Sequence, residues 1–188
     1  MSGPVGPGPF IAVVGASGVG KDSLMAYAAQ RSGAHFPRRV ITRPTGPGED
    51  HLPATDDEFD SAIARGGFAV HWEAHGLRYG IPIEVDDVVT SGRPVVVNVS
   101  RSVLDELAAR YERLVVVRVI VSDAVRRERL RARGRESTDE VVARLLRSDP
   151  APHWPGDVVI VNDGTIAEGG EQLIKTIRTA MGFLHSAR

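Results

Sequence analysis

The residues with the clearest chemical potential form one short run near the amino terminus: Gly15, Ala16, Ser17, Gly18, Val19, Gly20 and Lys21. The run has the spacing G-x-x-x-x-G-K, in which glycines let the backbone curl so that successive N–H groups face a phosphate chain. The lysine would reach the β and γ phosphates, and the helix that follows would add the positive end of its dipole. An apolar stretch precedes the run, which disfavours the alternative of a glycine-rich turn without a ligand. The spacing predicts a nucleotide-binding loop that ends with Asp22 and Ser23.

The position after the lysine departs from this pattern. It normally holds Ser or Thr, whose hydroxyl binds Mg²⁺, whereas this chain has Asp22 followed by Ser23. An aspartate beside nucleotide phosphates would be repelled unless a cation lay between them. Asp22 and Ser23 are therefore candidate Mg²⁺ ligands, directly or through water. The alternative role for Asp22 is an acid at a helix start, favoured by the helix dipole.

Strands and helices that alternate along the chain would position this loop. Apolar, β-rich runs predict strands at residues 10–14, 39–42, 94–99, 114–121 and 158–161, and a hairpin at 68–79 around His75 and Gly76. Helical patterns follow Lys21 and cover residues 56–65, 83–89, 101–110, 123–133, 138–147 and 166–183, and residues 44–53 are expected to form an exposed loop. Strands without internal alternation are typical of a parallel sheet covered on both faces. The order predicts an α/β fold.

Composition excludes several other classes of protein. The 188 residues carry a formal net charge of −1 and no cysteine, which excludes a disulfide framework and a cysteine nucleophile. No apolar run approaches a membrane span, and residues 1–9 resemble a flexible tail rather than a signal peptide. We therefore expect a cytoplasmic domain that contacts neither membrane nor nucleic acid. The arginine-rich residues 126–135 could bind nucleic acid, but they lack interleaved aromatic residues for base stacking.

Five further segments occur in the order found in guanylate kinases, which this chain resembles from Phe10 to Ile177. They are Thr42-Arg43-Pro44, Gly48-Glu49, Gly76-Leu-Arg-Tyr79-Gly80, Arg133-Gly-Arg-Glu136 and Val161-Asn-Asp163. The resemblance implies a P-loop NTPase fold, a parallel sheet flanked by helices. It divides the chain into a core (10–42, 94–122 and 158–188), an acceptor-binding insert (43–93) and an arginine-rich lid (about 123–157).

The same resemblance implies roles for individual residues. Arg43 and Tyr79 would hold the phosphate of the acceptor. The lid arginines Arg133, Arg135 and Arg144, together with Lys21, would neutralise the transferring phosphoryl group. ATP and Mg²⁺ are the implied cofactors, and the sequence does not indicate an oligomeric state.

Departures from guanylate kinases cluster where that family reads the guanine base. Gly46 replaces a second arginine, Val70 or His71 replaces the guanine-reading glutamate, and Ile81 and Ser100 replace a serine and an aspartate. A site without these groups cannot discriminate guanine by hydrogen bonding. Asn98 also stands where guanylate kinases have an aspartate, and our hypothesis is that the carboxylate of the metal site has moved to Asp22.

The complete set of motifs resembles the ribose 1,5-bisphosphate phosphokinases. It comprises Gly-Lys-Asp-Ser, Ile-Thr-Arg, Gly-Leu-x-Tyr-Gly, Val-Val-Asn-x-Ser-Arg and Arg-Gly-Arg-Glu. This resemblance implies transfer of the ATP γ-phosphoryl group to a sugar phosphate, which forms 5-phosphoribosyl 1-diphosphate during phosphonate breakdown. The second phosphate of such a substrate needs cationic partners, and the resemblance puts Arg101, Arg78, His71 and His75 near the acceptor site. Arg101 is the first candidate because it follows a strand end where guanylate kinases have a base reader, and Ser100 at that strand end is a further candidate for substrate binding.

Two other functions stay open at this point. A guanylate kinase, or another nucleoside monophosphate kinase, would use the same loop with a different acceptor. An inactive guanylate-kinase-like interaction module would share the fold, although such modules typically lose the phosphate loop that is present here.

Overall fold

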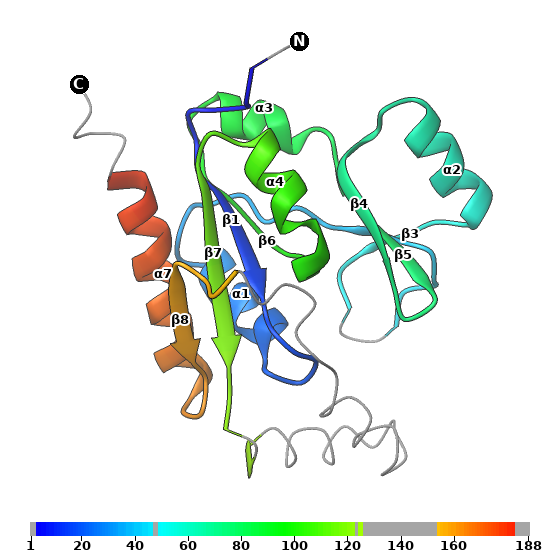
Figure 1. Ribbon diagram of the computed structural model, residues 1–188. Coiled ribbons are helices and arrows are strands. Elements are labelled where there is room, and N and C mark those ends of the chain that lie inside the picture. Colours follow the sequence, from blue (N-terminus) through cyan, green and yellow to red (C-terminus); the bar gives the residue numbers. More distant parts are fainter. Residues whose placement is uncertain (1–2, 47–48, 123, 126–153, 183–188) are drawn as a thin grey trace.

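The computed structural model describes residues 3–46, 49–122, 124–125 and 154–182 (Figure 1). The elements in chain order are β1 (Phe10–Val14), α1 (Lys21–Ala29), β2 (Val40–Ile41), β3 (Leu52–Pro53), α2 (Asp56–Ala64), β4 (Phe68–Ala74), β5 (Leu77–Pro82), α3 (Val85–Thr90), β6 (Val95–Asn98), the 3-10 turn η1 (Arg101–Val103), α4 (Leu104–Arg110), β7 (Leu114–Ile120), β8 (Val158–Val161) and α7 (Ile166–Gly182).

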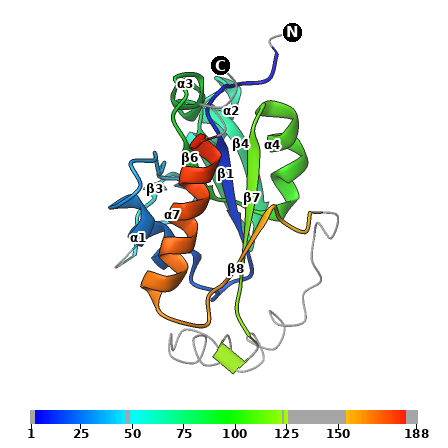
Figure 2. The ribbon, with the colours of Figure 1, turned by 90° about the vertical axis from the view of Figure 1, so that its left-hand side faces the viewer.

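The core is a four-stranded parallel sheet in the order β6-β1-β7-β8. Every residue of β1 is buried, and β6 is buried throughout, because helices cover both faces of the sheet. Figure 2 shows α1 and α7 on one face and α4 on the other. The parallel α/β architecture expected from the sequence is confirmed.

Side chains of β1 alternate between two apolar clusters, as the period of a strand requires. Ile11 and Val13 pack with Leu24 of α1 and Leu173 of α7. Phe10 points to the opposite face, where its ring stacks on Tyr111 with centroids 4.3 Å apart. The sheet is thereby held from both sides, which gives the loop after β1 a rigid base.

A second sheet, in the order β3-β2-β5-β4, stands beside the core and carries α2 on its outer side (Figure 1). The hairpin of β4 and β5 forms where expected, with His75 at φ 57° and Gly76 at φ 70° in its turn. Two successive residues in the left-handed region match the twist of the paired strands. The Thr55 hydroxyl and the Glu58 carboxylate form a capping box that starts α2.

Three segments differ from the sequence expectation. Strand β2 was expected to belong to the core, which was to extend to residue 42. It pairs instead with β5 and β3 in the second sheet. Residues 44–53 do not remain exposed throughout, because Leu52–Pro53 forms β3 and His51 is only 5% exposed. The described part of the tail is attached to the core, since the Val5 N–H donates to the Arg110 carbonyl at 2.7 Å.

Apart from residues 124–125, which are helical, the expected helix at 123–133 lies outside the described residues, as do the expected helix at 138–147 and most of the lid. Among the residues that are described, no helix is both long and apolar enough to cross a membrane.

Gly80 gives a test of the packing in the second sheet. A Cβ at Gly80 would lie 2.5 Å from a carbon of the Phe68 ring, and that ring packs on Phe59 with centroids 4.6 Å apart. Gly80→Ala should therefore lower the free energy of unfolding in urea by about 1–3 kcal/mol, because the ring has to move. The matched control is Gly182→Ala at the end of α7, where a Cβ meets nothing within 4 Å. Equal stability of Gly80→Ala and wild type would contradict this packing.

Candidate functional site

The loop between β1 and α1 has the backbone that its glycines predict. Gly18 and Gly20 adopt φ of 85° and 90°, in the left-handed region that side chains disfavour. Gly15 allows a close approach instead, since a Cβ there would lie 2.4 Å from the Val119 carbonyl oxygen of β7. Substitution at any of these three positions would change the course of the loop.

Lys21 starts α1 and folds back over this loop. Its ammonium group donates to the carbonyl oxygens of Gly15 at 2.8 Å and Ala16 at 3.0 Å. The positive charge is thus held on the concave side of the curled backbone, where the sequence pattern places the β and γ phosphates of a nucleotide.

The floor of the loop is attached to the far edge of the core sheet. The Asn162 amide, directly after β8, donates to the Val19 carbonyl at 2.8 Å, and Asn162 is only 3% exposed. Gly169 of α7 makes room for this side chain, since a Cβ there would lie 2.9 Å from Asn162 Oδ1. The Asp163 carboxylate accepts from the Ser122 N–H at 2.8 Å and joins the ends of β8 and β7.

Asp22 and Asn98 meet although they are 76 residues apart in the sequence. The Asn98 amide donates to Asp22 Oδ1 at 2.7 Å. Asn98 is 7% exposed at the carboxyl end of β6, whereas Asp22 and its neighbour Ser23 are exposed on the first turn of α1. The pair presents carboxylate and amide oxygens beside the phosphate loop, a donor set that suits Mg²⁺. Within the described residues no three histidine or acidic side chains cluster as a ready-made metal site.

The second sheet presents an aromatic surface on the face that packs against the core. Tyr79 of β5 lies opposite Trp72 of β4, and their rings stack with centroids 5.4 Å apart. The Arg39 guanidinium lies 5.7 Å from the Tyr79 ring centroid. Both Trp72 and Tyr79 belong to the apolar cluster that includes the core strand β6.

Arg43 follows β2 by two residues and forms an ion pair with Glu49. Its guanidinium nitrogen lies 2.8 Å from Glu49 Oε2. The Gly46 N–H also donates to Glu49 Oε2, at 3.1 Å, and His51 Nε2 lies 3.2 Å from the Arg43 carbonyl oxygen. The hydrogen bond from Arg43 lowers the pKa of Glu49, and the same bond raises the pKa of Arg43. Arg43 and Glu49 therefore stay charged together, and the pair as a whole is neutral.

His71 of β4 and Arg78 of β5 lie on the face of the second sheet opposite Tyr79. His71 lies 6.3 Å from the Phe59 ring centroid, and Arg78 lies over the same ring at 4.5 Å and pairs with Asp60 at 2.7 Å. Alternation along β4 and β5 causes this separation, because Trp72 and Tyr79 occupy the other face. The structure does not bring His71 together with Tyr79 and Arg43.

Ser100 and Arg101 follow β6 at the same edge of the core sheet as Asn98. The Ser100 hydroxyl caps η1 by accepting from the Ser102 N–H at 3.3 Å, and Arg101 is half-buried at the start of that turn. The remaining residues assigned to the site from the sequence, Arg133, Arg135 and Arg144, lie outside the described residues.

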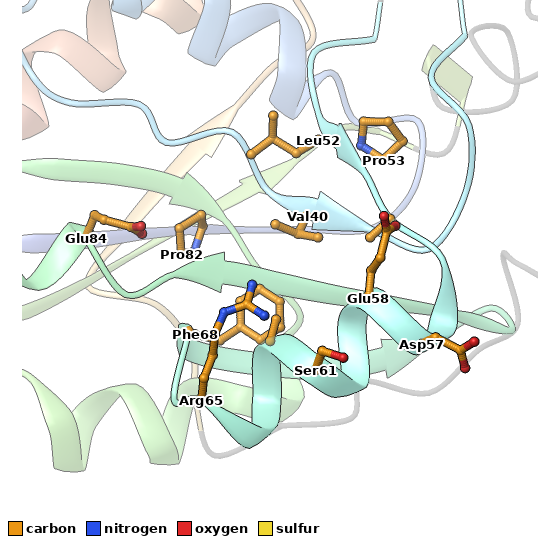
Figure 3. Close-up of a pocket in the computed structure, with 13 residues that line it drawn as sticks. Val40, Leu52, Pro53, Asp57, Glu58, Ser61, Arg65, Phe68, Pro82 and Glu84 are labelled. Carbon is orange, nitrogen blue, oxygen red and sulfur yellow. The ribbon is translucent and has the colours of Figure 1, made fainter.

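A hollow of about 540 Å³ lies on the outer face of the second sheet, away from the phosphate loop. Val40, Phe68 and Pro82 form its floor, and Glu58 of α2 and Arg65, the residue directly after α2, lie at its rim (Figure 3). Val40 lies on the face opposite Ile41, which pairs with Tyr79. The hollow therefore lies on the face of the second sheet opposite Tyr79, and no residue of the phosphate loop lines it.

Two residues of this region were not singled out from the sequence. Asn162 was only part of the Val161-Asn-Asp163 motif, and nothing in that motif indicates that its amide supports the phosphate loop. Arg39 was the first residue of an expected strand. Its alternation with Ile41 could have placed it on the Tyr79 face, but only if the pairing of β2 with β5 had been known.

Curated proteins similar to this chain carry names that include a kinase of ribose 1,5-bisphosphate. A ribose 1,5-bisphosphate phosphokinase of Pseudofrankia inefficax is 64% identical over 184 residues, 97% of either chain. One of Bradyrhizobium diazoefficiens is 42% identical over 94% of this chain and 91% of its own. A bifunctional ribose 1,5-bisphosphokinase-thymidine phosphorylase of Azorhizobium caulinodans is 41% identical over 92% of this chain, which corresponds to 26% of that longer protein. No family model matches the chain.

Solved structures agree with the fold. A guanylate kinase from Anaplasma phagocytophilum superimposes with a TM-score of 0.68 at 21% identity, over 96% of this chain and 89% of its own. A gluconokinase from Sinorhizobium meliloti gives a TM-score of 0.56 at 22% identity, over 97% and 98% of the two chains. The expected P-loop fold is confirmed.

The Asn162 contact predicts a link between β8 and nucleotide affinity. Asn162→Ala leaves the buried Val19 carbonyl without this donor, so the loop should loosen and ADP affinity should fall about tenfold. Titration calorimetry with ADP measures this loss. The control is Thr176→Val, which removes a hydrogen bond to the Gln172 carbonyl within α7. Thr176→Val should retain wild-type ADP affinity, and unchanged affinity in Asn162→Ala would refute the supporting role.

Proposed function

This chain belongs to the ribose 1,5-bisphosphate phosphokinase family, and we propose on that basis that it converts ribose 1,5-bisphosphate and ATP to 5-phosphoribosyl 1-diphosphate and ADP. An oxygen of the 1-phosphate attacks the γ-phosphorus, and the bond from that phosphorus to the β–γ bridging oxygen breaks. The observation that carries the proposal is the complete phosphate loop with Lys21, in a chain 64% identical to a protein of that name over nearly its whole length.

Catalysis in this proposal rests on position and charge. Lys21 and the loop N–H groups bind the β and γ phosphates of ATP, with the loop supported by Asn162. The accepting phosphate is already an anion at neutral pH, so no dedicated general base is needed. In-line placement and charge neutralisation supply the rate enhancement.

Mg²⁺ is part of the proposal, with Asp22 as its principal protein ligand and Ser23 beside it, directly or through water. The contact between Asp22 and Asn98 supports this assignment, since it gives one carboxylate and one amide at the edge of the loop. Mg²⁺ usually keeps several waters and bridges to phosphate oxygens, so few protein ligands suffice.

On the acceptor side, we assign Arg43 and Tyr79 to the accepting phosphate, and Arg101 and Ser100 to the second phosphate. Tyr79 lies on the face that packs toward the core, and Arg101 and Ser100 lie at the end of β6 beside Asn98. His71 is left out of this assignment because its ring packs near Phe59, on the other face. Arg133, Arg135 and Arg144 are proposed as lid arginines on the family resemblance alone.

The choice of acceptor can be tested directly, and the test covers both alternative functions. The residues that read guanine in guanylate kinases are absent from this chain, and GMP has no second phosphate to pair with the cations assigned to one. We therefore expect kcat/KM for GMP to be at least about a hundredfold below that for ribose 1,5-bisphosphate. A coupled assay of ADP release with each acceptor measures the ratio. Comparable values would identify a nucleoside monophosphate kinase, and no turnover with either would favour an inactive module.

The metal assignment predicts coupling between Asp22 and Asn98. Asp22→Ser should lose much of the activity and need more Mg²⁺ for half-saturation, and Asn98→Asp should place two acids together and also impair the enzyme. The double variant should recover part of the loss, a non-additivity of about 1 kcal/mol or more. Each protein is assayed across a Mg²⁺ titration.

The hydrogen bond between the two side chains would couple them even without a metal. The same four proteins are therefore also unfolded in urea without Mg²⁺, which measures the hydrogen bond alone. Equal half-saturating Mg²⁺ in all four would show that Asp22 and Asn98 do not bind the metal.

A further inference from the structure

Arg39 lies on the Tyr79 side of the second sheet. It precedes β2, where the pairs Val40–Gly80 and Ile41–Tyr79 set the register, so it shares a face with Ile41. Its guanidinium lies 5.7 Å from the centroid of the Tyr79 ring, on the face that packs toward the core. Its carbonyl accepts from the Leu52 N–H at 2.8 Å, which holds the backbone at this point.

The other arginines of the second sheet have carboxylate partners. Arg43 pairs with Glu49 at 2.8 Å, Arg78 with Asp60 at 2.7 Å, and Arg38 with Asp50 at 3.7 Å. No hydrogen bond or ion pair joins the Arg39 guanidinium to another described residue. Within the described part of the chain, Arg39 is therefore the arginine of this face that has no carboxylate in direct contact.

The electrostatic surroundings place this charge close to both the donor and the acceptor sides. Burial lowers the pKa of Arg39, Asp22 and Tyr79 oppose that change, and the positive charge of Arg43 adds to it. Asp22 belongs to the phosphate loop, whereas Tyr79 and Arg43 belong to the acceptor surface. A partly desolvated guanidinium without a counter-ion is costly, and a phosphate dianion is the ligand that relieves this cost with paired hydrogen bonds.

We propose that Arg39 binds the accepting phosphate of the substrate and supplies the cation that the neutral Arg43–Glu49 pair does not. The inference rests on the proposed function for the identity of the sugar, but the anion site itself follows from the position of Arg39. The phosphate would lie over Tyr79, with Arg39 between it and the metal-binding end of the loop.

The test compares Arg39→Met with Arg38→Met, a neighbouring arginine whose side chain is 55% exposed. Arg39→Met should raise KM for ribose 1,5-bisphosphate about tenfold or more and leave KM for ATP within about twofold. Its melting temperature without ligand should not fall, because no carboxylate of the described residues is in direct contact with the charge that is lost. Arg38→Met should match wild type in both constants. Arg39→Lys, which keeps the charge but not the fork of donors, should lie between Arg39→Met and wild type.

A second measurement separates this inference from the identity of the substrate. With ADP at saturation, so that the phosphate loop is occupied, inorganic phosphate should raise the melting temperature of wild type and Arg38→Met, but not that of Arg39→Met. This result would support the anion site even if wild type did not use ribose 1,5-bisphosphate. An equal response of Arg39→Met and wild type to phosphate, or a lower melting temperature with unchanged KM, would overturn the proposal.

Discussion

Repulsion between phosphate groups is the constraint from which the arrangement of this site follows. A nucleotide and a sugar bisphosphate must approach until one phosphate oxygen reaches the phosphorus of another, and every charge involved is negative. In the described structure Lys21 lies over the phosphate loop, and the Arg39 guanidinium lies near the Tyr79 ring of the second sheet. In the proposed function these two cations would reduce the repulsion from the donor side and from the acceptor side. Asp22 is the exception, and the proposed Mg²⁺ would account for it, since a carboxylate beside phosphates is favourable only with a divalent cation between them.

The core sheet makes this charge arrangement possible because it supports the loop from several directions. Val119 of β7 leaves room only for glycine at position 15, and Asn162 at the end of β8 binds the Val19 carbonyl. Asn98 at the end of β6 binds Asp22. Parallel strands end at one edge of the sheet, so residues of β6 and β7 and the residue after β8 can all contact the loop that follows β1.

The second sheet sorts its side chains by the alternation of its strands. Trp72 and Tyr79 face the core, whereas His71 and Arg78 pack against α2. Alternation also places Arg78 and Arg39 on opposite faces, where their charges have different partners. Arg78 stabilises the outer layer through Asp60 and the Phe59 ring, while Arg39 retains a charge that no carboxylate of the described residues contacts directly. A protein stabilised only for folding would have little reason to keep an arginine in that position.

The sequence by itself determined the features that depend on local spacing. The phosphate loop, the parallel strands around it, the hairpin turn at His75-Gly76 and the family were all predicted, because glycine positions, strand periodicity and motif order lie within short stretches. The tertiary structure alone decided which distant residues meet: Asp22 with Asn98, Val19 with Asn162, and Arg39 with Tyr79. His71 is the opposite case, a residue that the sequence assigned to the acceptor site. Strand alternation places it on the face of the second sheet opposite Tyr79. The physical reason is that a strand's partner and register determine the face on which each side chain lies, and long-range packing chooses both.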